Sequence, residues 1–398
     1  MTNRRNVAIV SFVSFVAMGI TSSVLGPTLP NIAAALVLPI ENAGILRAAQ
    51  QIGMFGATLA GGYVLNRFSP RSVLIPGLSL MAAGLVLTIS TGSLNVALGA
   101  MLLIGIGSGL LNLGANVAIV ALYESNASAV LAALHTFFGL GLFGGPLIAE
   151  QVLRQPENWR MAYLVPAITS VILAVAFALI HMDSPRRAEA ASPEPSDARN
   201  SIRWLPLLPL ILLLFTYNGA GNGIGDWIAT HLQLVARAAA DSAAQVTSLY
   251  GLALTAGRAI SIVALSRFGN MRVMAAAVGI SIVGAVLILL AGAQIGAVAV
   301  GVALVGLGFS PVYPTVIAIA GQQQPENRGA VTGIVAGIAS VGGIVVPVIQ
   351  GWVGAGQSGG MLVTLASALI MAASLFMIHL MSNGEQQTVT AVEGRSGS

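Results

Sequence analysis

Cysteine and lysine are absent from this chain, and charged residues make up only 8% of its 398 residues. Without cysteine, disulfides and thiolate metal sites are excluded. A soluble domain of this length needs far more charge to solvate its surface. The scarcity of charge, together with a hydrophobic content of 56% and 47 glycines, therefore predicts a membrane protein. The net charge of +4 is too small to indicate a nucleic-acid partner.

Long apolar runs fill most of the chain, and each is long enough to cross ~30 Å of hydrocarbon, which takes ~20 residues. We expect an all-α membrane protein with twelve transmembrane helices. The runs are Val7–Leu29, Ala43–Leu65, Val73–Thr91, Asn95–Leu122, Ala129–Val152, Met161–Met182, Leu205–Leu232, Ala243–Leu265, Val273–Ala291, Gly296–Ala320, Ala330–Trp352 and Met361–Met381.

One long polar stretch divides the twelve runs into six and six. Its Pro, Ser, Ala and mixed charges are typical of a solvated linker. Arg67-Phe68-Ser69 after the second run resembles Arg267-Phe268-Gly269 after the eighth, an offset of 200 residues that indicates two related halves. The sequence thus predicts two pseudo-symmetric six-helix bundles. The expected parts are an N-terminal bundle (1–182), a cytoplasmic linker (183–203), a C-terminal bundle (204–382) and a disordered cytoplasmic tail (383–398).

The arginines predict the orientation in the membrane. With the N-terminus in the cytoplasm, twelve arginines fall on that side and only Arg154, Arg160 and Arg237 on the other, while Arg47 and Arg258 lie within apolar runs. Cytoplasmic loops of membrane proteins carry such an excess of positive charge. We therefore expect both termini to be cytoplasmic in a multi-pass protein of a bacterial-type inner membrane.

Polar side chains interrupt the fourth and fifth runs. Asn112 and Asn116 are four residues apart and share one face of a helix. Asn116 and His135 each lie ~10 Å from the turn that joins the two helices, so they occupy similar depths. Polar groups at such positions usually face a cavity or another helix. We expect Asn112 and Asn116 to bind substrate and His135 to gate or relay protons, with hydrogen bonding between helices as the structural alternative.

The seventh run, FTYNGAGNGIGDWIATHL, has four glycines between Gly219 and Gly225. Glycine lets a helix unwind or lets another backbone approach closely, and broken helices build binding sites in transporters. Four candidates for substrate binding lie here: Tyr217, Asn218 and Asn222 as hydrogen-bonding groups and Trp227 as a stacking face. A fifth, Tyr313, stands between two prolines and indicates a kinked helix beside the cavity. Close helix packing by small residues is the alternative reading.

Asp226 is the only aspartate within an apolar run. An isolated buried carboxylate is costly, so Asp226 should be either paired or protonated. It lies ~12 Å from the outer end of its helix, Arg47 lies ~8 Å from the same surface, and Arg258 is ~14 Å from the opposite surface. Depth therefore favours an Arg47–Asp226 contact that bridges the halves when the outer face is closed. Arg258 could bind an anion or form an ion pair, and Glu150 near an outer helix end could act in coupling or be solvated.

The loop after the second run resembles the signature G-x-x-x-D-R-x-G-R-R/K of the major facilitator superfamily, which Gly62, Arg67 and Arg71 match. Asn66 replaces the aspartate of that signature, and Ser69 and Pro70 replace its glycine and arginine. The resemblance implies the superfamily's twelve-helix fold and alternating access. It also implies a cytoplasmic latch between the halves, formed by Gly62, Arg67, Arg71 and their counterparts Arg267 and Arg272.

A narrower resemblance is to fucose-permease-like sugar:proton symporters. It rests on His135-Thr136-Phe137-Phe138-Gly139 and on the segments Tyr217-Asn218-Gly219 and Trp227-Ile228-Ala229-Thr230. It implies proton-coupled transport of a small polar, sugar-like solute. That group tends to carry acids where Asn112 and Gly221 stand here. The pattern Gly141-x-x-x-Gly145-Pro146 instead resembles drug:proton antiporters, which leaves export of amphipathic compounds as the alternative.

Other classes of function lack the residues they need. Gly223-Ile224-Gly225-Asp226 matches a pattern of intramembrane aspartyl proteases, but that chemistry requires two carboxylates and the membrane runs contain no second aspartate. No phosphate-binding G-x-x-x-x-G-K-[ST] is present. We expect a transporter and not an enzyme, with no cofactor or metal. The expected partners are a small-molecule substrate, protons and the lipid bilayer, and the expected state is a monomer.

Overall fold

The computed structural model describes residues 4–65, 68–123, 127–180, 182, 202–324, 327–354 and 358–396. Within these ranges every regular element is a helix. The elements before the polar segment are α1 Arg4–Ser23, α2 Leu25–Ala35, η1 Ile40–Asn42, α3 Gly44–Leu65, α4 Arg71–Ser90, α5 Leu94–Leu122, α6 Ala127–Leu153, η3 Pro156–Tyr163 and α7 Leu164–Leu179. Those after it are η5 Leu205–Leu207, α8 Leu208–Leu234, α9 Ala240–Phe268, α10 Asn270–Ala291, α11 Ile295–Phe309, α12 Val312–Gln323, α13 Arg328–Gly354 and α14 Gly359–Ser396.

The membrane spans correspond closely to the predicted runs. Eleven helical segments of the described chain are long and apolar enough to cross a membrane. The expected span Ala43–Leu65 forms α3, a helix of 22 residues that is not among the eleven. Arg47, Gln50 and Gln51 lower its hydropathy, and the same side chains form part of the site described below.

Proline explains two places where one predicted run becomes two helices. The proline ring clashes with the carbonyl of the residue four positions earlier, which ends the preceding helix. Pro27 lies four residues after Ser23, where α1 ends, and Pro314 lies four residues after Ser310, where the chain passes from α11 to α12. The bend expected around Tyr313 is therefore present.

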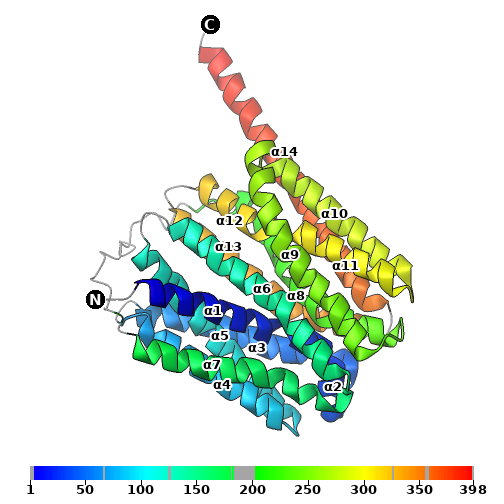
Figure 1. Ribbon diagram of the computed structural model, residues 1–398. Coiled ribbons are helices and arrows are strands. Elements are labelled where there is room, and N and C mark those ends of the chain that lie inside the picture. The colour runs from blue at the N-terminus through cyan, green and yellow to red at the C-terminus, as the bar shows by residue number, and fades with distance from the viewer. Residues whose placement is uncertain are drawn as a thin grey trace.

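The helices form two groups that lie side by side (Figure 1). In the N-terminal group α5 packs against α3 and α4, and α1 against α6. In the C-terminal group α8 packs against α13 and α14, and α10 against α11. The two groups meet chiefly where α6 contacts α9, α3 contacts α13 and α2 contacts α8. We refer to these groups as the N half and the C half.

The two ends of the helix bundle are distinguished by the elements that lie there. The inner end is where α1 begins and α14 ends, and the outer end is where α2 and η1 lie. Nearly all of the predicted linker, residues 183–201, lies outside the described residues. The helix α14 continues to Ser396 and thus extends over the segment for which the sequence predicts a disordered tail.

Candidate functional site

A buried ion pair joins the two halves. Arg47 of α3 directs its guanidinium at the carboxylate of Asp226 on α8, with Nε donating to Oδ2 over 2.7 Å and a second nitrogen donating to Oδ1. The two side chains are 6% and 2% exposed. This is the contact that depth along the helices predicts, and Arg258 takes no part in it. A two-point pairing of this kind satisfies both charges where water is excluded.

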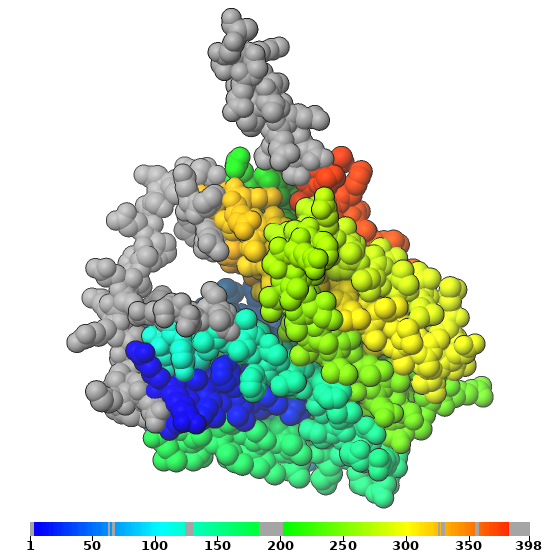
Figure 2. Space-filling model, turned by 45° about the horizontal axis from the view of Figure 1, so that its top comes forward, coloured from blue at the N-terminus to red at the C-terminus, as the bar shows by residue number. Residues whose placement is uncertain are grey.

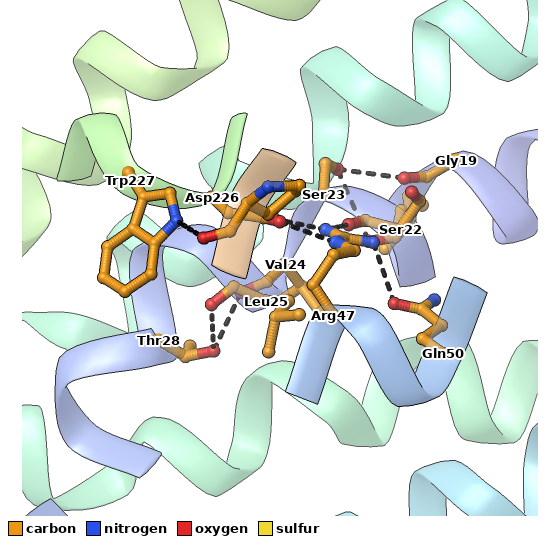
Figure 3. A network of polar contacts seen from close by, with 12 residues as sticks. Gly19, Ser22, Ser23, Val24, Leu25, Thr28, Arg47, Gln50, Asp226 and Trp227 are labelled. Atoms are coloured by element: carbon orange, nitrogen blue, oxygen red, sulfur yellow. Dashed lines mark hydrogen bonds and ion pairs between the residues drawn. The ribbon is translucent and has the colours of Figure 1, made fainter. Parts of the chain in front are cut away.

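Two further donors of Arg47 are also used (Figure 3). One terminal nitrogen donates to Gln50 Oε1 over 2.8 Å, and the other donates to the carbonyl of Ser22 at the end of α1 over 2.7 Å. Arg47 therefore ties α1, α3 and α8 together at one point. Because Asp226 supplies the compensating negative charge from the C half, separating the halves here would leave both charges unpaired.

Close backbone contacts seal the outer end around this pair. A Cβ added to Gly26 of α2 would collide with the carbonyl of Gly225 and would lie 3.0 Å from the Cα of Asp226. A Cβ on Gly44, at the start of α3, would lie 2.7 Å from the Pro347 carbonyl of α13. The glycines thus permit backbones of opposite halves to touch. In α8 they serve close approach and not unwinding, since α8 is continuous from Leu208 to Leu234.

Toward the inner end, glycines of the same helices have open space beside them. A Cβ added to Gly56 or Gly62 of α3, or to Gly333 or Gly337 of α13, would meet nothing within 4 Å. Figure 2 shows a hollow on this side, between the cyan part of the N half and the gold α12. The structure is therefore closed at the outer end and open at the inner end.

Amide side chains lie where α3, α8 and α13 come together. A Cβ added to Gly343 would lie 2.6 Å from Asn222 Nδ2 and 3.2 Å from Gln51 Nε2, so both amides lie over this glycine. Asn222 and Asn218 are half-buried, one turn apart on α8. These amides offer donors and acceptors to a polar ligand.

An aromatic group adjoins the amides. The ring of Tyr217 meets Phe309 edge-on, with centroids 5.6 Å apart, and lies 6.4 Å from the ring of Tyr313. Tyr217 is buried, whereas Tyr313 is 40% exposed. The hydroxyl of Tyr250 on α9 lies 3.1 Å from where a Cβ on Gly221 would be. The partly exposed ring of Tyr313 on α12 thus lies beside Tyr217 of α8.

The asparagines of α5 bond to each other. Asn116 Nδ2 donates to Asn112 Oδ1 over 2.6 Å and to the Asn112 carbonyl over 2.8 Å. Both residues are half-buried. Hydrogen bonding between helices was the structural alternative for these asparagines. The observed bonds instead join two residues of the same helix.

His135 and Arg258 meet across the halves. Arg258 of α9 donates to the backbone carbonyl of His135 on α6 over 3.4 Å. The exposed imidazole of His135 lies edge-on to the buried ring of Phe15, with centroids 5.5 Å apart. No ion pair of Arg258 occurs within the described residues. Anion binding by Arg258 stays a prediction.

Two proposed site residues lie away from the hollow. Trp227 is 1% exposed, donates its indole N–H to the Pro347 carbonyl over 2.9 Å and packs against Gly351. It therefore offers no stacking face to a ligand in this conformation. Glu150 faces Arg154 one turn away on α6, at 4.0 Å. This partly solvated pair fits the alternative of a solvated carboxylate.

The proposed latch residues contact their own halves. Arg71 donates to the Ala178 carbonyl of α7, Arg267 stacks over the ring of Phe268, and Arg272 lines a groove between α10 and α14. Gly62 faces open space, and Arg67 lies outside the described residues. A latch role for these residues stays a prediction.

The sequence did not single out several residues of this site as ligands. Gln50 and Gln51 are visible as amides next to Arg47 in an apolar run, and the sequence leaves open whether they reach a neighbouring helix or the cavity. Tyr250 and Phe309 gave no such signal, because an aromatic side chain in an apolar helix is usually part of the core.

Comparison with known proteins agrees with this architecture. A family model described as "Major Facilitator Superfamily" matches residues 8–347 and 236–394. "Sodium-dependent glucose transporter 1" of Rattus norvegicus is 35% identical over 144 residues, which are 34% of this chain and 28% of that protein. The Xenopus laevis protein of that name is 23% identical over 325 residues, 74% of this chain and 65% of that one. The chain thus spans less than two thirds of the length of these relatives.

Solved structures share the fold. The nucleoside transporter NupG superposes with a TM-score of 0.76 at 16% identity, covering 96% of this chain and 99% of that one. An inward-facing bacterial homologue of the human lysosomal transporter Spinster superposes with a TM-score of 0.77 at 14% identity, covering 94% of this chain and 96% of that one. The transporter FucP in its outward conformation superposes with a TM-score of 0.62 at 19% identity, covering 94% of this chain and 98% of that one. At these identities the likeness concerns the fold alone.

Proposed function

This chain belongs to the major facilitator superfamily, and from that premise we propose that it is a secondary transporter for a small polar solute, sugar-like or nucleoside-like, working by alternating access. The observation that carries the proposal is the buried Arg47–Asp226 pair, which bridges the halves at a closed outer end while the inner end is open. The relatives named as glucose transporters support a sugar-like solute, while the nucleoside transporter and the D-xylose-proton symporter among the solved structures share the fold.

The solute binds in the hollow between the amides of α8 and the exposed ring of Tyr313. Asn218, Asn222 and Gln51 supply hydrogen bonds to hydroxyl groups, and the tyrosine face covers the ring of the solute. Asn112 and Asn116 line the N-half side. This combination of a few polar groups with an aromatic wall is typical of sites for small molecules.

Transport requires the outer end to open, which separates Arg47 from Asp226. A proton arriving on Asp226 removes the negative charge that holds Arg47 and so permits the separation. Arg47 retains Gln50 and the Ser22 carbonyl as partners in the N half. We place the protein in a bacterial-type inner membrane as a monomer with both termini cytoplasmic, so that the open end faces the cytoplasm.

Uptake into proteoliposomes tests this proposal. The panel is glucose, xylose, fucose, uridine and, for the exporter alternative, a cationic dye, each with an imposed proton gradient, an imposed sodium gradient or none. We expect a sugar or nucleoside to accumulate only with the proton gradient. Accumulation driven by sodium alone would overturn proton coupling, and movement of the dye alone would overturn the substrate class.

A further inference from the structure

A groove on the outside of the C half lies far from the Arg47–Asp226 site. It runs between α10 and α14, which pack side by side (Figure 1), and has a volume of about 420 Å³. Its lining consists of Met271, Arg272, Ala275, Val278, Gly279, Ile282, Ala372, Leu375, Phe376 and His379. All of these except Arg272 and His379 are apolar, and none is acidic.

The two polar residues lie at the same level in the membrane. Arg272 is in the first turn of α10, and His379 is two residues before the end of the apolar span Gly359–Met381 of α14. Both therefore mark the inner end of the groove, where hydrocarbon gives way to lipid headgroups. A guanidinium at that level pairs well with phosphate oxygens, which accept two parallel hydrogen bonds.

The depth of the groove equals one leaflet. At ~1.5 Å per residue, Ile282 lies ~15 Å beyond Arg272 along α10, which is half of a ~30 Å hydrocarbon core. Gly279 lies ~10 Å beyond Arg272 on the same helix. It is exposed and leaves open space, since a Cβ there would meet nothing within 4 Å. The missing side chain makes room for an acyl chain along the helix.

We propose that this groove binds one anionic phospholipid of the inner-end leaflet, with its phosphate at Arg272 and an acyl chain lying along Gly279 toward Ile282. The positive mouth selects an anionic over a zwitterionic headgroup, because the described residues of the lining include no acid that could hold a choline or ethanolamine group. Basic pockets between helices at a membrane surface bind such headgroups. The proposal is independent of the transported substrate.

The test uses purified full-length protein in nanodiscs of equal parts phosphatidylglycerol and phosphatidylcholine. After transfer to detergent, native mass spectrometry counts retained lipids. We expect one phosphatidylglycerol on the wild type. Arg272→Gln should reduce the preference for phosphatidylglycerol at least fivefold, and Gly279→Leu should reduce retention of both lipids because leucine fills the groove. Inorganic phosphate alone should neither bind nor stabilise the protein.

Matched controls separate this site from general effects. Arg267→Gln removes the same charge at the neighbouring helix end, outside the groove. Gly99→Leu adds the same side chain at another exposed glycine with open space around it. Both should retain lipid as the wild type does. Equal losses in the two arginine variants, unchanged retention in Gly279→Leu, protection by phosphate alone, or a dimer that Gly279→Leu dissociates would each overturn the proposal.

Discussion

Arg47 and Asp226 form a two-point ion pair between α3 and α8, and both side chains are almost completely buried. Removing one partner of such a pair leaves an uncompensated charge and costs about 3–5 kcal/mol. We therefore expect Asp226→Asn and Arg47→Gln each to lose transport and to lower the melting temperature. The neutral double variant should recover stability, and the charge-swapped variant Arg47→Asp/Asp226→Arg should recover part of the transport.

The matched control for this prediction is Glu150→Gln. Glu150 also pairs with an arginine, but the pair is partly solvated and is worth at most about 1 kcal/mol. Transport and thermal unfolding should stay near the wild-type values. Wild-type uptake by Asp226→Asn would contradict an essential role for the buried pair.

The open inner end predicts a pattern of chemical labelling. Because the chain has no cysteine, any introduced cysteine is unique. Thr58 of α3 is exposed and lies on the helix face of Gly44 and Gln51, at intervals of seven residues, whereas Ala57 is 7% exposed and packs against α5 near Gly109. We expect Thr58→Cys to react with a membrane-impermeant maleimide from the inner side, and Ala57→Cys to remain unlabelled. Absence of labelling at Thr58→Cys would show that the hollow does not reach this depth.

The contact between Gly26 and Gly225 predicts how the resting conformation can be shifted. A methyl group at position 26 has no room while the outer end is closed, and such overpacking costs about 1–3 kcal/mol. Gly26→Ala should therefore favour the outward-open state. If the closed state is destabilised by about 1.4 kcal/mol, the ratio of outward-open to closed molecules rises tenfold. The measurable consequences are slower uptake and weaker labelling of Thr58→Cys.

Gly56→Ala is the control for that substitution. Gly56 also lies in a helix of the N half, but an added Cβ meets nothing within 4 Å. Uptake and labelling should be unchanged. Stronger labelling of Thr58→Cys in the Gly26→Ala background would be the opposite of the expected shift.

The Arg47–Asp226 pair shows what a sequence can predict in a membrane protein. Two isolated charges at matching depth have few ways to be compensated in hydrocarbon, so depth along the helices was enough to match them. The twelve runs were visible for a similar reason, since hydrocarbon thickness fixes their length. Even α3, whose hydropathy is too low for it to be among the eleven candidate spans, is less apolar because it carries Arg47, Gln50 and Gln51.

Trp227 and Tyr250 show where that reasoning ended. Both are aromatic residues of apolar helices. The depth of a residue along its helix does not indicate which face of that helix lines the hollow. That face depends on helix tilt and on contacts such as the bond from the Trp227 indole to the Pro347 carbonyl, which join positions 120 residues apart. The glycines of α8 were ambiguous for the same reason, because either unwinding or close approach would have suited them.

Tyr313 provides the sharpest test of the solute site, because its ring is accessible while its aromatic neighbours Tyr217 and Phe309 are buried. Ring contacts of this kind contribute about 0.5–1.5 kcal/mol beyond burial, which corresponds to a change of up to about tenfold in affinity. We expect Tyr313→Leu to raise KM for the transported solute up to about tenfold with little change in maximal rate, whereas Tyr313→Phe, which keeps the ring, should remain near wild type. If Tyr313→Phe instead lost as much affinity as Tyr313→Leu, the hydroxyl and not the ring face would hold the solute. An unchanged KM in both variants would place the solute elsewhere in the hollow, toward Asn112 and Asn116.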